Sequence, residues 1–310
     1  MSMMSSLPVT IVHACMRDGS GGSPTAVLED APLTDAERCR IPALMGTSHA
    51  VFVSVDDIQG DDTPASLRFF TAAGELPACG HGTVAALAFL AARTKDAAGS
   101  TGAKSAKDAE YRATLRTSAR VFEGWAIRDG DLIDAAFEVG AVDLREPTAD
   151  ECGLVLPALG LAADEVGLGA RVRARVASVG RARLLVPVPT RSALDALCPD
   201  FDRLRAACDQ FGFLGCYVYS APTANGRIAA RMFAPSIGVP EDIANANSTA
   251  CLAAHLADQG VTEIAVDMGD GLGSPATITA AAAPAPAGRL IHLGGAAALR
   301  SDQPVYVSVG

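Results

Sequence analysis

Two stretches of this chain repeat one pattern: an arginine–aromatic segment, a turn with glycine and proline, and an almost wholly apolar helix. The first covers residues 68–90 and the second residues 231–256, with nine positions from arginine to proline in both. A helix that is apolar on all sides must be buried, so each one needs a shell of other elements around it. The repeat therefore predicts two related halves.

Short alternating strands in the rest of the chain can form that shell. At 310 residues the chain suits two domains of roughly 150 residues each. We expect an α+β fold in which short antiparallel strands wrap around a buried helix, twice over. The predicted domains are 1–140 and 146–297, and residues 298–310 should form a strand that returns to the first domain.

Charge and cysteine usage narrow the functional classes. The net charge of −10, from 35 acidic and 25 basic residues, argues against a nucleic-acid surface. The sequence has neither an apolar run of about 18 residues nor a signal-peptide pattern, which predicts a cytoplasmic protein without a membrane partner. The eight cysteines include no Cys-x-x-Cys pair, so their spacing predicts neither a metal site nor a set of disulfides.

The start of the first apolar helix gathers groups that suit an anionic ligand. Cys79, Gly80, His81 and Gly82 stand where a helix presents unpaired N–H groups and a partial positive charge. His81 can hydrogen-bond a carboxylate there, with capping or packing as the alternative. The helix dipole would lower the pKa of the Cys79 thiol, although a small core side chain is the favoured reading of this residue.

Several motifs in a fixed order add a resemblance that covers nearly the whole chain. The specific ones are Glu-Leu-Pro-x-Cys-Gly-His and Gly-Val-Pro-Glu-Asp. The segments that carry the resemblance are residues 22–27, 47–53, 70–81, 180–186, 197–200, 231–242 and 293–295. In these segments the chain resembles the PhzF-like family of isomerases, which shares the diaminopimelate epimerase fold.

The resemblance implies a more specific fold and activity. The fold would consist of two pseudo-symmetric domains, each an antiparallel β-barrel wrapped around a central helix. The activity would be proton transfer without a cofactor or a metal, on a small carboxylate-bearing substrate. The family is often dimeric and serves biosynthesis, including antibiotic biosynthesis, so a homodimer with such a role is expected.

Departures from the family pattern bear on the chemistry. The acid/base glutamate of the family's isomerases matches His49 here, while the second helix motif keeps Asp242 and replaces Thr and Ser by Asn245 and Asn247. Histidine has an ordinary pKa near 6.5 and can shuttle a proton at neutral pH. The epimerases of this fold need a second cysteine near Asn245, so a two-thiol racemase is disfavoured.

These arguments assign roles and leave alternatives. The predicted catalytic residues are His49, Asp242 and Cys79, with Asp242 orienting the imidazole if the two side chains pair. The predicted substrate-binding residues are His81, Gly80, Gly82, Asn245, Asn247 and Ser23. Alternatively, His49 is a satisfied histidine in an inactive copy, Asp242 is a carboxylate favoured by the helix dipole, and the asparagines form turns and N-caps.

The predicted function is a cofactor-independent isomerase. It would move a proton, and with it a double bond, on a small unsaturated carboxylate or amino acid in bacterial secondary metabolism. A one-base epimerase, a carbon–carbon hydrolase and a catalytically inactive ligand-binding homologue stay open as alternatives.

Overall fold

The chain folds into two compact units. The computed structural model describes residues 5–55, 64–98, 110–162, 173–285, 288–300 and 305–309. Unit 1 comprises Met1–Glu138 and Gly294–Gly310, and unit 2 comprises Val139–Leu293. The sequence predicted domain boundaries at residues 140–146 and at residue 298. None of the helices in the described ranges combines the length and the apolar character needed to cross a membrane.

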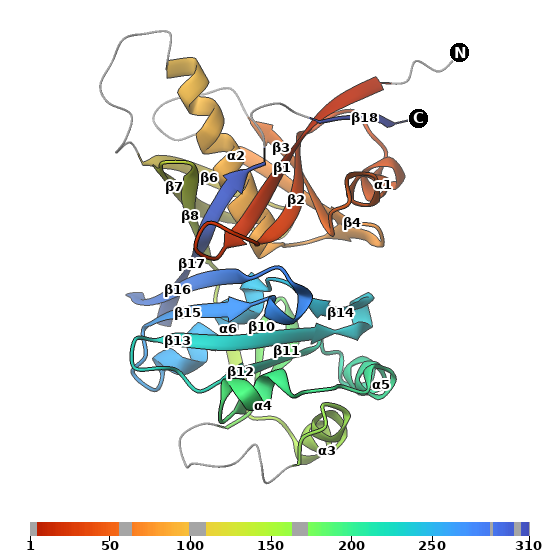
Figure 1. Cartoon of the computed structure of the whole chain (residues 1–310), viewed down its shortest axis with the longest axis vertical. Helices are drawn as coiled ribbons and strands as arrows, with labels where there is room; N and C mark the ends of the chain where they lie inside the picture. Colours follow the sequence, from red (N-terminus) through yellow and green to blue (C-terminus); the bar gives the residue numbers. More distant parts are fainter. Residues whose placement is uncertain are drawn as a thin grey trace. The chain divides into compact units, whose positions relative to one another are not determined.

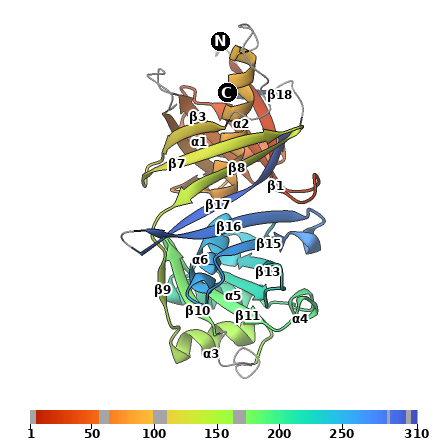
Figure 2. The ribbon, with the colours of Figure 1, turned by 90° about the vertical axis from the view of Figure 1, so that its left-hand side faces the viewer.

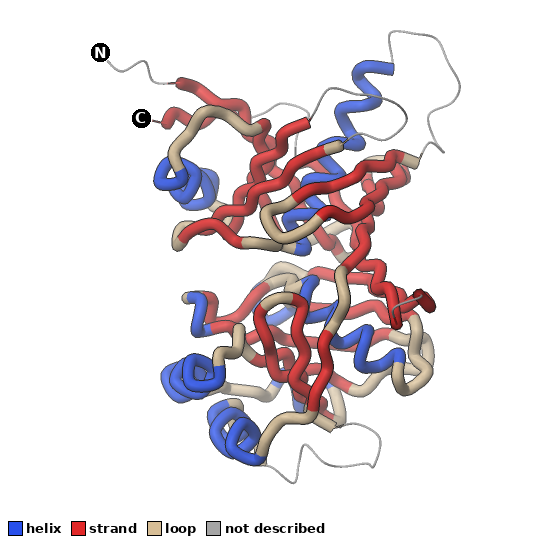
Figure 3. Tube along the Cα trace, turned by 180° about the vertical axis from the view of Figure 1, so that it is seen from behind, coloured by secondary structure: helices blue, strands red, loops and turns tan. Residues whose placement is uncertain are grey.

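Unit 1 is mostly strand (Figure 3). Its elements are β1 (Ser5–Met16), β2 (Ser23–Glu29), α1 (Asp35–Met45), β3 (His49–Val55), β4 (Ala65–Thr71), β5 (Gly74–Leu76), α2 (Gly80–Ala98), β6 (Tyr111–Arg116), β7 (Val121–Asp129), β8 (Leu132–Val139) and β18 (Val305–Val309). β18 pairs antiparallel with β1, so the end of the chain lies beside its beginning (Figure 1).

Unit 2 has the same character. Its elements are β9 (Asp143–Arg145), α3 (Ala149–Ala158), β10 (Arg175–Val179), β11 (Arg181–Val188), α4 (Arg191–Asp195), α5 (Phe201–Phe211), β12 (Cys216–Ser220), β13 (Arg227–Ala234), β14 (Val239–Asp242), α6 (Ala246–Ala257), β15 (Glu263–Met268), β16 (Ala276–Ala285) and the first half of β17 (Gly288–Leu299). With α1 and α2, the described residues form six α-helices in a mixed α+β fold.

Both apolar helices are buried, as the sequence predicts. In α2 every side chain from Val84 to Ala88 is fully buried, and the helix packs on β1, β2, β3 and β7 (Figure 2). In α6 the side chains of Ala250, Cys251 and Leu252 are fully buried, and the helix packs on β10, β15 and β16. Burying a full turn of apolar side chains supplies several kcal/mol at about 0.8 kcal/mol per CH₂ group, which fixes each helix within its unit.

The strands are not antiparallel throughout, which corrects one expectation. β2 and β3 run parallel, as do β4 and β6, and unit 2 repeats this with β11–β12 and β13–β15. We therefore describe mixed sheets and do not assign closed antiparallel barrels. Parallel neighbours need a crossover connection. Helices lie in these crossover connections. The sequence could not predict the parallel pairs, because the alternation of apolar residues does not reveal the direction of the neighbouring strand.

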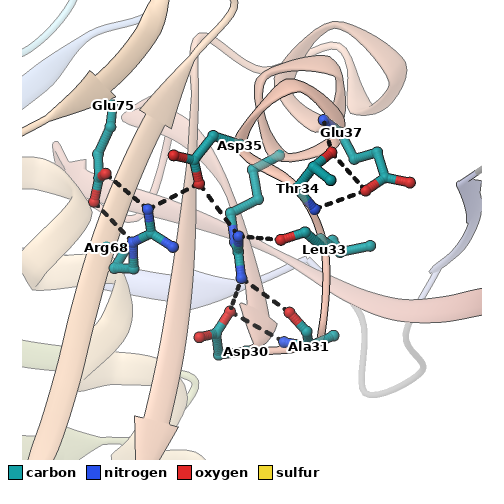
Figure 4. Close-up of polar contacts among 9 residues, drawn as sticks. Asp30, Ala31, Leu33, Thr34, Asp35, Glu37, Arg68 and Glu75 are labelled. Atoms are coloured by element: carbon teal, nitrogen blue, oxygen red, sulfur yellow. Dashed lines mark hydrogen bonds and ion pairs between the residues drawn. The ribbon is translucent and has the colours of Figure 1, made fainter.

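An arginine anchors the strand before α2. Arg68 in β4 binds both carboxylate oxygens of Glu75 at 2.8 Å and also reaches Asp35 at 2.9 Å (Figure 4). Its guanidinium lies 4.9 Å from the ring centroid of Phe70. Glu75, which a sequence reader could take for an acid/base group, therefore belongs to a structural ion pair.

The strand before α6 carries the matching arrangement. Arg231 in β13 binds both carboxylate oxygens of Glu241, at 2.9 and 2.8 Å, and lies 4.8 Å from the ring centroid of Phe233. It also donates to the backbone oxygens of Leu194 and Leu197. In both units the helix begins five positions after the glutamate, at residues 80 and 246. The two copies of the sequence pattern thus form the same local structure, one copy in each unit.

Candidate functional site

Two predicted site residues of unit 1, His49 and His81, lie against each other. His49 begins β3 and His81 is the second residue of α2. Nε2 of His81 is 3.1 Å from Nδ1 of His49, and the rings meet edge to face with centroids 4.4 Å apart. Both side chains are buried, at 9% and 4% exposed. Two imidazoles held this way share one hydrogen between the facing nitrogens.

A thiol and a hydroxyl extend this pair at either end. Sγ of Cys79 lies 3.5 Å from Nε2 of His81, and Oγ of Ser48 lies 2.8 Å from Nδ1 of His49. The four side chains form a continuous polar chain within an otherwise apolar region. Cys79 is 5% exposed, whereas Ser48 is exposed, so this row of four side chains runs from the interior to the surface.

The start of α2 is held tightly against the strands. Cys79 provides the first helical carbonyl, which accepts hydrogen bonds from the Thr83 N–H at 2.9 Å and the Thr83 hydroxyl at 2.8 Å. A Cβ placed on Gly82 would come within 3.0 Å of Sγ of Cys79 and within 3.1 Å of Val51. Gly82 therefore permits the close approach that brings Cys79 and His81 to β3.

Burial makes His49 hard to protonate. Burial, followed by the positive charge that His81 can carry, lowers the pKa of His49 to about 2. At neutral pH the His49 ring is neutral and keeps one lone pair. Since Nδ1 faces His81 and Ser48, the tautomer with hydrogen on Nδ1 leaves the lone pair on Nε2. That arrangement can accept a proton from a bound molecule.

In unit 2 the predicted residues of the second motif form a helix cap. Oδ1 of Asn245 accepts from the Ser248 N–H at 3.0 Å, and Nδ2 of Asn245 donates to the Asp242 carboxylate at 3.0 Å. Asn245 is the N-cap of α6, and Asn247 lies half-buried in its first turn. Capping was one of the alternatives that the sequence left open for Asn245. The catalytic role of Asp242 and its pairing with His49 stay predictions.

The remaining predicted residues lie at element starts in unit 1. Ser23 is buried at the first position of β2, and two residues later Thr25 stands opposite His49 in the parallel pair. Gly80 is the first residue of α2 and is buried. Ser23 thus lies in the strand that pairs with the strand of His49, and Gly80 begins the helix that packs on that strand.

The side chains around His81 could also bind a metal ion. His49, Cys79 and His81 each offer one ligand atom, and these atoms lie within 4.8 Å of one another. Within the described ranges this is the one group of three or more such ligands found. The sequence predicted no metal site because the cysteine spacing has no metal pattern, and His49 is distant along the chain.

Sequence reasoning missed two features of this site. It did not foresee the contact between His49 and His81, and it gave Ser48 no role. Thirty-two positions separate His49 from His81, and only the packing of α2 on β3 sets their distance. The adjacency of Ser48 to His49 was the one available signal.

Comparison with known proteins decides the family. The model of the PhzC-PhzF family, described as phenazine biosynthesis-like protein, matches residues 12–302. The chain belongs to this family. The resemblance seen in the sequence is thereby confirmed.

Relatives and solved structures agree with this assignment. The chain is 30% identical to a trans-2,3-dihydro-3-hydroxyanthranilate isomerase of Pseudomonas aeruginosa over 80% of this chain and 78% of that one. It is 26% identical to an uncharacterized isomerase of Escherichia coli O157:H7 over 78% and 75% of the two chains. A PhzF-family crystal structure from Bacillus anthracis superposes with a TM-score of 0.78, at 17% identity and over 98% and 99% of the chains. The chain is an enzyme of an isomerase family.

Proposed function

We propose that this enzyme is a cofactor-independent isomerase that moves a proton, and with it a double bond, on a small unsaturated carboxylate or amino acid. The single observation that carries the proposal is the buried pair of His49 and His81 at the start of α2. The pair supplies a neutral base, held by a hydrogen bond to its neighbour, beside a helix start that favours anions.

The proposed reaction uses the neutral His49 ring. Nε2 takes a proton from the carbon next to the conjugated system, and the electron pair of that C–H bond spreads into the carboxylate-conjugated π system. The imidazolium then returns the proton to another carbon, so atoms and charges balance. His81 and Ser48 hold the Nδ1 side and act as positioning residues.

The low pKa of His49 fits a substrate-dependent base. With the site empty, burial disfavours the imidazolium. A substrate carboxylate near the helix start adds a negative charge, which stabilises the imidazolium and raises the pKa. The base would thus gain strength only when an anionic substrate is bound.

Relatives support the substrate class. Three similar proteins from Pseudomonas species are named trans-2,3-dihydro-3-hydroxyanthranilate isomerase, a name that describes a cyclic, unsaturated amino acid. Small unsaturated acids of this type carry the carboxylate and the conjugated C–H bond that the proposed chemistry needs.

Solvent exchange tests the proposal. A panel of small unsaturated acids and amino acids is incubated in deuterated water, and deuterium at carbon is followed by NMR and mass spectrometry. We expect exchange and double-bond migration in one compound with wild type, and a loss of about 10²–10⁴-fold in His49→Gln, the range of general acid–base catalysis. His49→Glu should recover part of the rate because it restores an acid/base group.

A matched control separates catalysis from folding. His255 lies in the last turn of α6 in unit 2, where its Nε2 is 3.1 Å from Nε2 of Gln259, so His255→Gln removes a histidine outside the pair and should exchange as wild type does. Equal exchange by wild type and His49→Gln would remove His49 as the base. Tight binding of a panel member without exchange would instead favour the ligand-binding homologue, and exchange at a stereocentre alone would favour the epimerase.

A further inference from the structure

We propose that His49, Cys79 and His81 form a binding site for one soft divalent cation of the Zn²⁺ class. The site uses Nδ1 of His49, Nε2 of His81 and Sγ of Cys79. These three atoms belong to side chains that are nine-tenths or more buried, and they converge on one another. The inference goes beyond the isomerase proposal, because it assigns a ligand other than the substrate.

Two of the three distances between the donor atoms are close to those of a tetrahedral site, and the third, from the His49 nitrogen to Sγ of Cys79, lies within 4.8 Å. Zn–N bonds of about 2.0–2.1 Å and a Zn–S bond of about 2.3 Å at tetrahedral angles separate two nitrogens by about 3.3 Å, and nitrogen from sulfur by about 3.6 Å. The observed separations are 3.1 Å between Nδ1 of His49 and Nε2 of His81, and 3.5 Å between Nε2 of His81 and Sγ of Cys79.

The donor set determines which cation fits. Two imidazoles and a thiolate suit Zn²⁺ and its close relatives, whereas Mg²⁺ and Ca²⁺ prefer oxygen ligands. Three protein ligands leave a fourth position for water or another small donor. On binding, the hydrogen between the two imidazoles moves to a ring nitrogen that does not bind the cation, so both rings stay neutral, and the thiol proton passes to the solvent.

Ser48 competes with a cation for one ligand atom of the site. Its hydroxyl lies 2.8 Å from the same Nδ1 of His49, so it must turn away when that nitrogen binds a cation. Ser48 is exposed, and its side chain can turn toward solvent. Removing the hydroxyl should therefore leave cation affinity unchanged or raise it.

Cobalt(II) is the probe because its colour reports the ligands. The full chain, first dialysed against a chelator, is titrated with Co²⁺ and followed by absorption spectroscopy. We expect saturation at one equivalent, a thiolate-to-cobalt charge-transfer band, and displacement of the cobalt by Zn²⁺. Cys79→Ser should lose the band and bind at least about 100-fold more weakly, above the 10–100-fold cost of losing an outer-shell partner.

Controls make the result specific. Cys198→Ser removes an exposed thiol elsewhere and should keep the band and the affinity, and Ser48→Ala should keep both. Circular dichroism checks folding. If Cys79→Ser fails to fold, His81→Gln serves instead, with the thiol retained and the affinity reduced by a similar factor.

The outcomes are distinct from those of the isomerase test. Absence of saturable binding at one equivalent, or an unchanged band in Cys79→Ser, overturns the cation site. The titration contains no substrate, and the exchange assay is run in chelator, so either proposal can fail while the other stands.

Discussion

The starts of α2 and α6 stand on matching scaffolds but carry different chemistry. Counted from the anchoring glutamate, Cys79 corresponds to Asn245, and His81 corresponds to Asn247. In each unit a threonine in the first turn bonds back to the first helical carbonyl, at 2.8 Å in α2 and 3.2 Å in α6. The repeated scaffold thus fixes the helix starts. At these two positions α2 carries groups that can exchange protons, while α6 carries amides that only hydrogen-bond.

The neighbouring strands sharpen this contrast. Ala50 stands opposite Phe70 in unit 1 and Cys216 stands opposite Phe233 in unit 2, so the residue matching His49 is Gly215. A Cβ at Gly215 would lie 2.0 Å from the Phe233 carbonyl oxygen. Unit 2 therefore has no room for a side chain where unit 1 holds the imidazole.

Replacing His81 in α2 by the residue found at the corresponding position of α6 should have the largest effect on activity. His81→Asn gives α2 the side chain that α6 has at the corresponding position. The amide cannot titrate, so it cannot take or return a proton beside His49, and we expect solvent exchange of the substrate to fall about 100-fold. Exchange rates of the folded variant measure the effect, and a rate within about twofold of wild type would refute the role of His81.

The two arginine–glutamate pairs should contribute differently to the free energy of unfolding. Arg231 and Glu241 are 19% and 11% exposed, while Arg68 and Glu75 are 34% and 32% exposed. We expect Glu241→Gln to lower the free energy of unfolding by about 2 kcal/mol, because it leaves a mostly buried cation poorly paired. Glu75→Gln should cost less than about 1 kcal/mol.

Urea unfolding of both variants measures this difference. Glu146→Gln, at an ion pair with a side chain that is 71% exposed, is the control for loss of a surface charge and should have little effect. Equal losses at Glu75 and Glu241 would show that the two anchors are equivalent in energy as well as in geometry.

The helix cap gives the smallest expected change. Asn245→Ala removes the acceptor for the Ser248 N–H and should destabilise the protein by about 1 kcal/mol. Asn245→Ser keeps a capping oxygen and should recover most of that loss. Thermal unfolding compares the two, and identical values would mean that the cap contributes nothing beyond its contact with Asp242.

The sequence repeat located the anchors but misjudged their register. It matched Pro77 with Pro240, each nine positions after its arginine. The structure matches Glu75 with Glu241, because ion pairing and the start of the helix, rather than the proline, define the equivalent points. Aligning the two copies on their prolines hides the difference in the number of residues between the arginine and the glutamate.

The sequence by itself determined the family, the two buried helices and the candidate residues at the start of α2. These follow from motifs of neighbouring residues, from the order of those motifs along the chain, and from runs of apolar residues. Only the tertiary structure decided that β2 runs parallel to β3, that Glu75 is an anchor, and that His49 meets His81, which also contacts Cys79. Such contacts join segments far apart in the chain, and close packing of a helix on strands sets their distances to within a hydrogen bond.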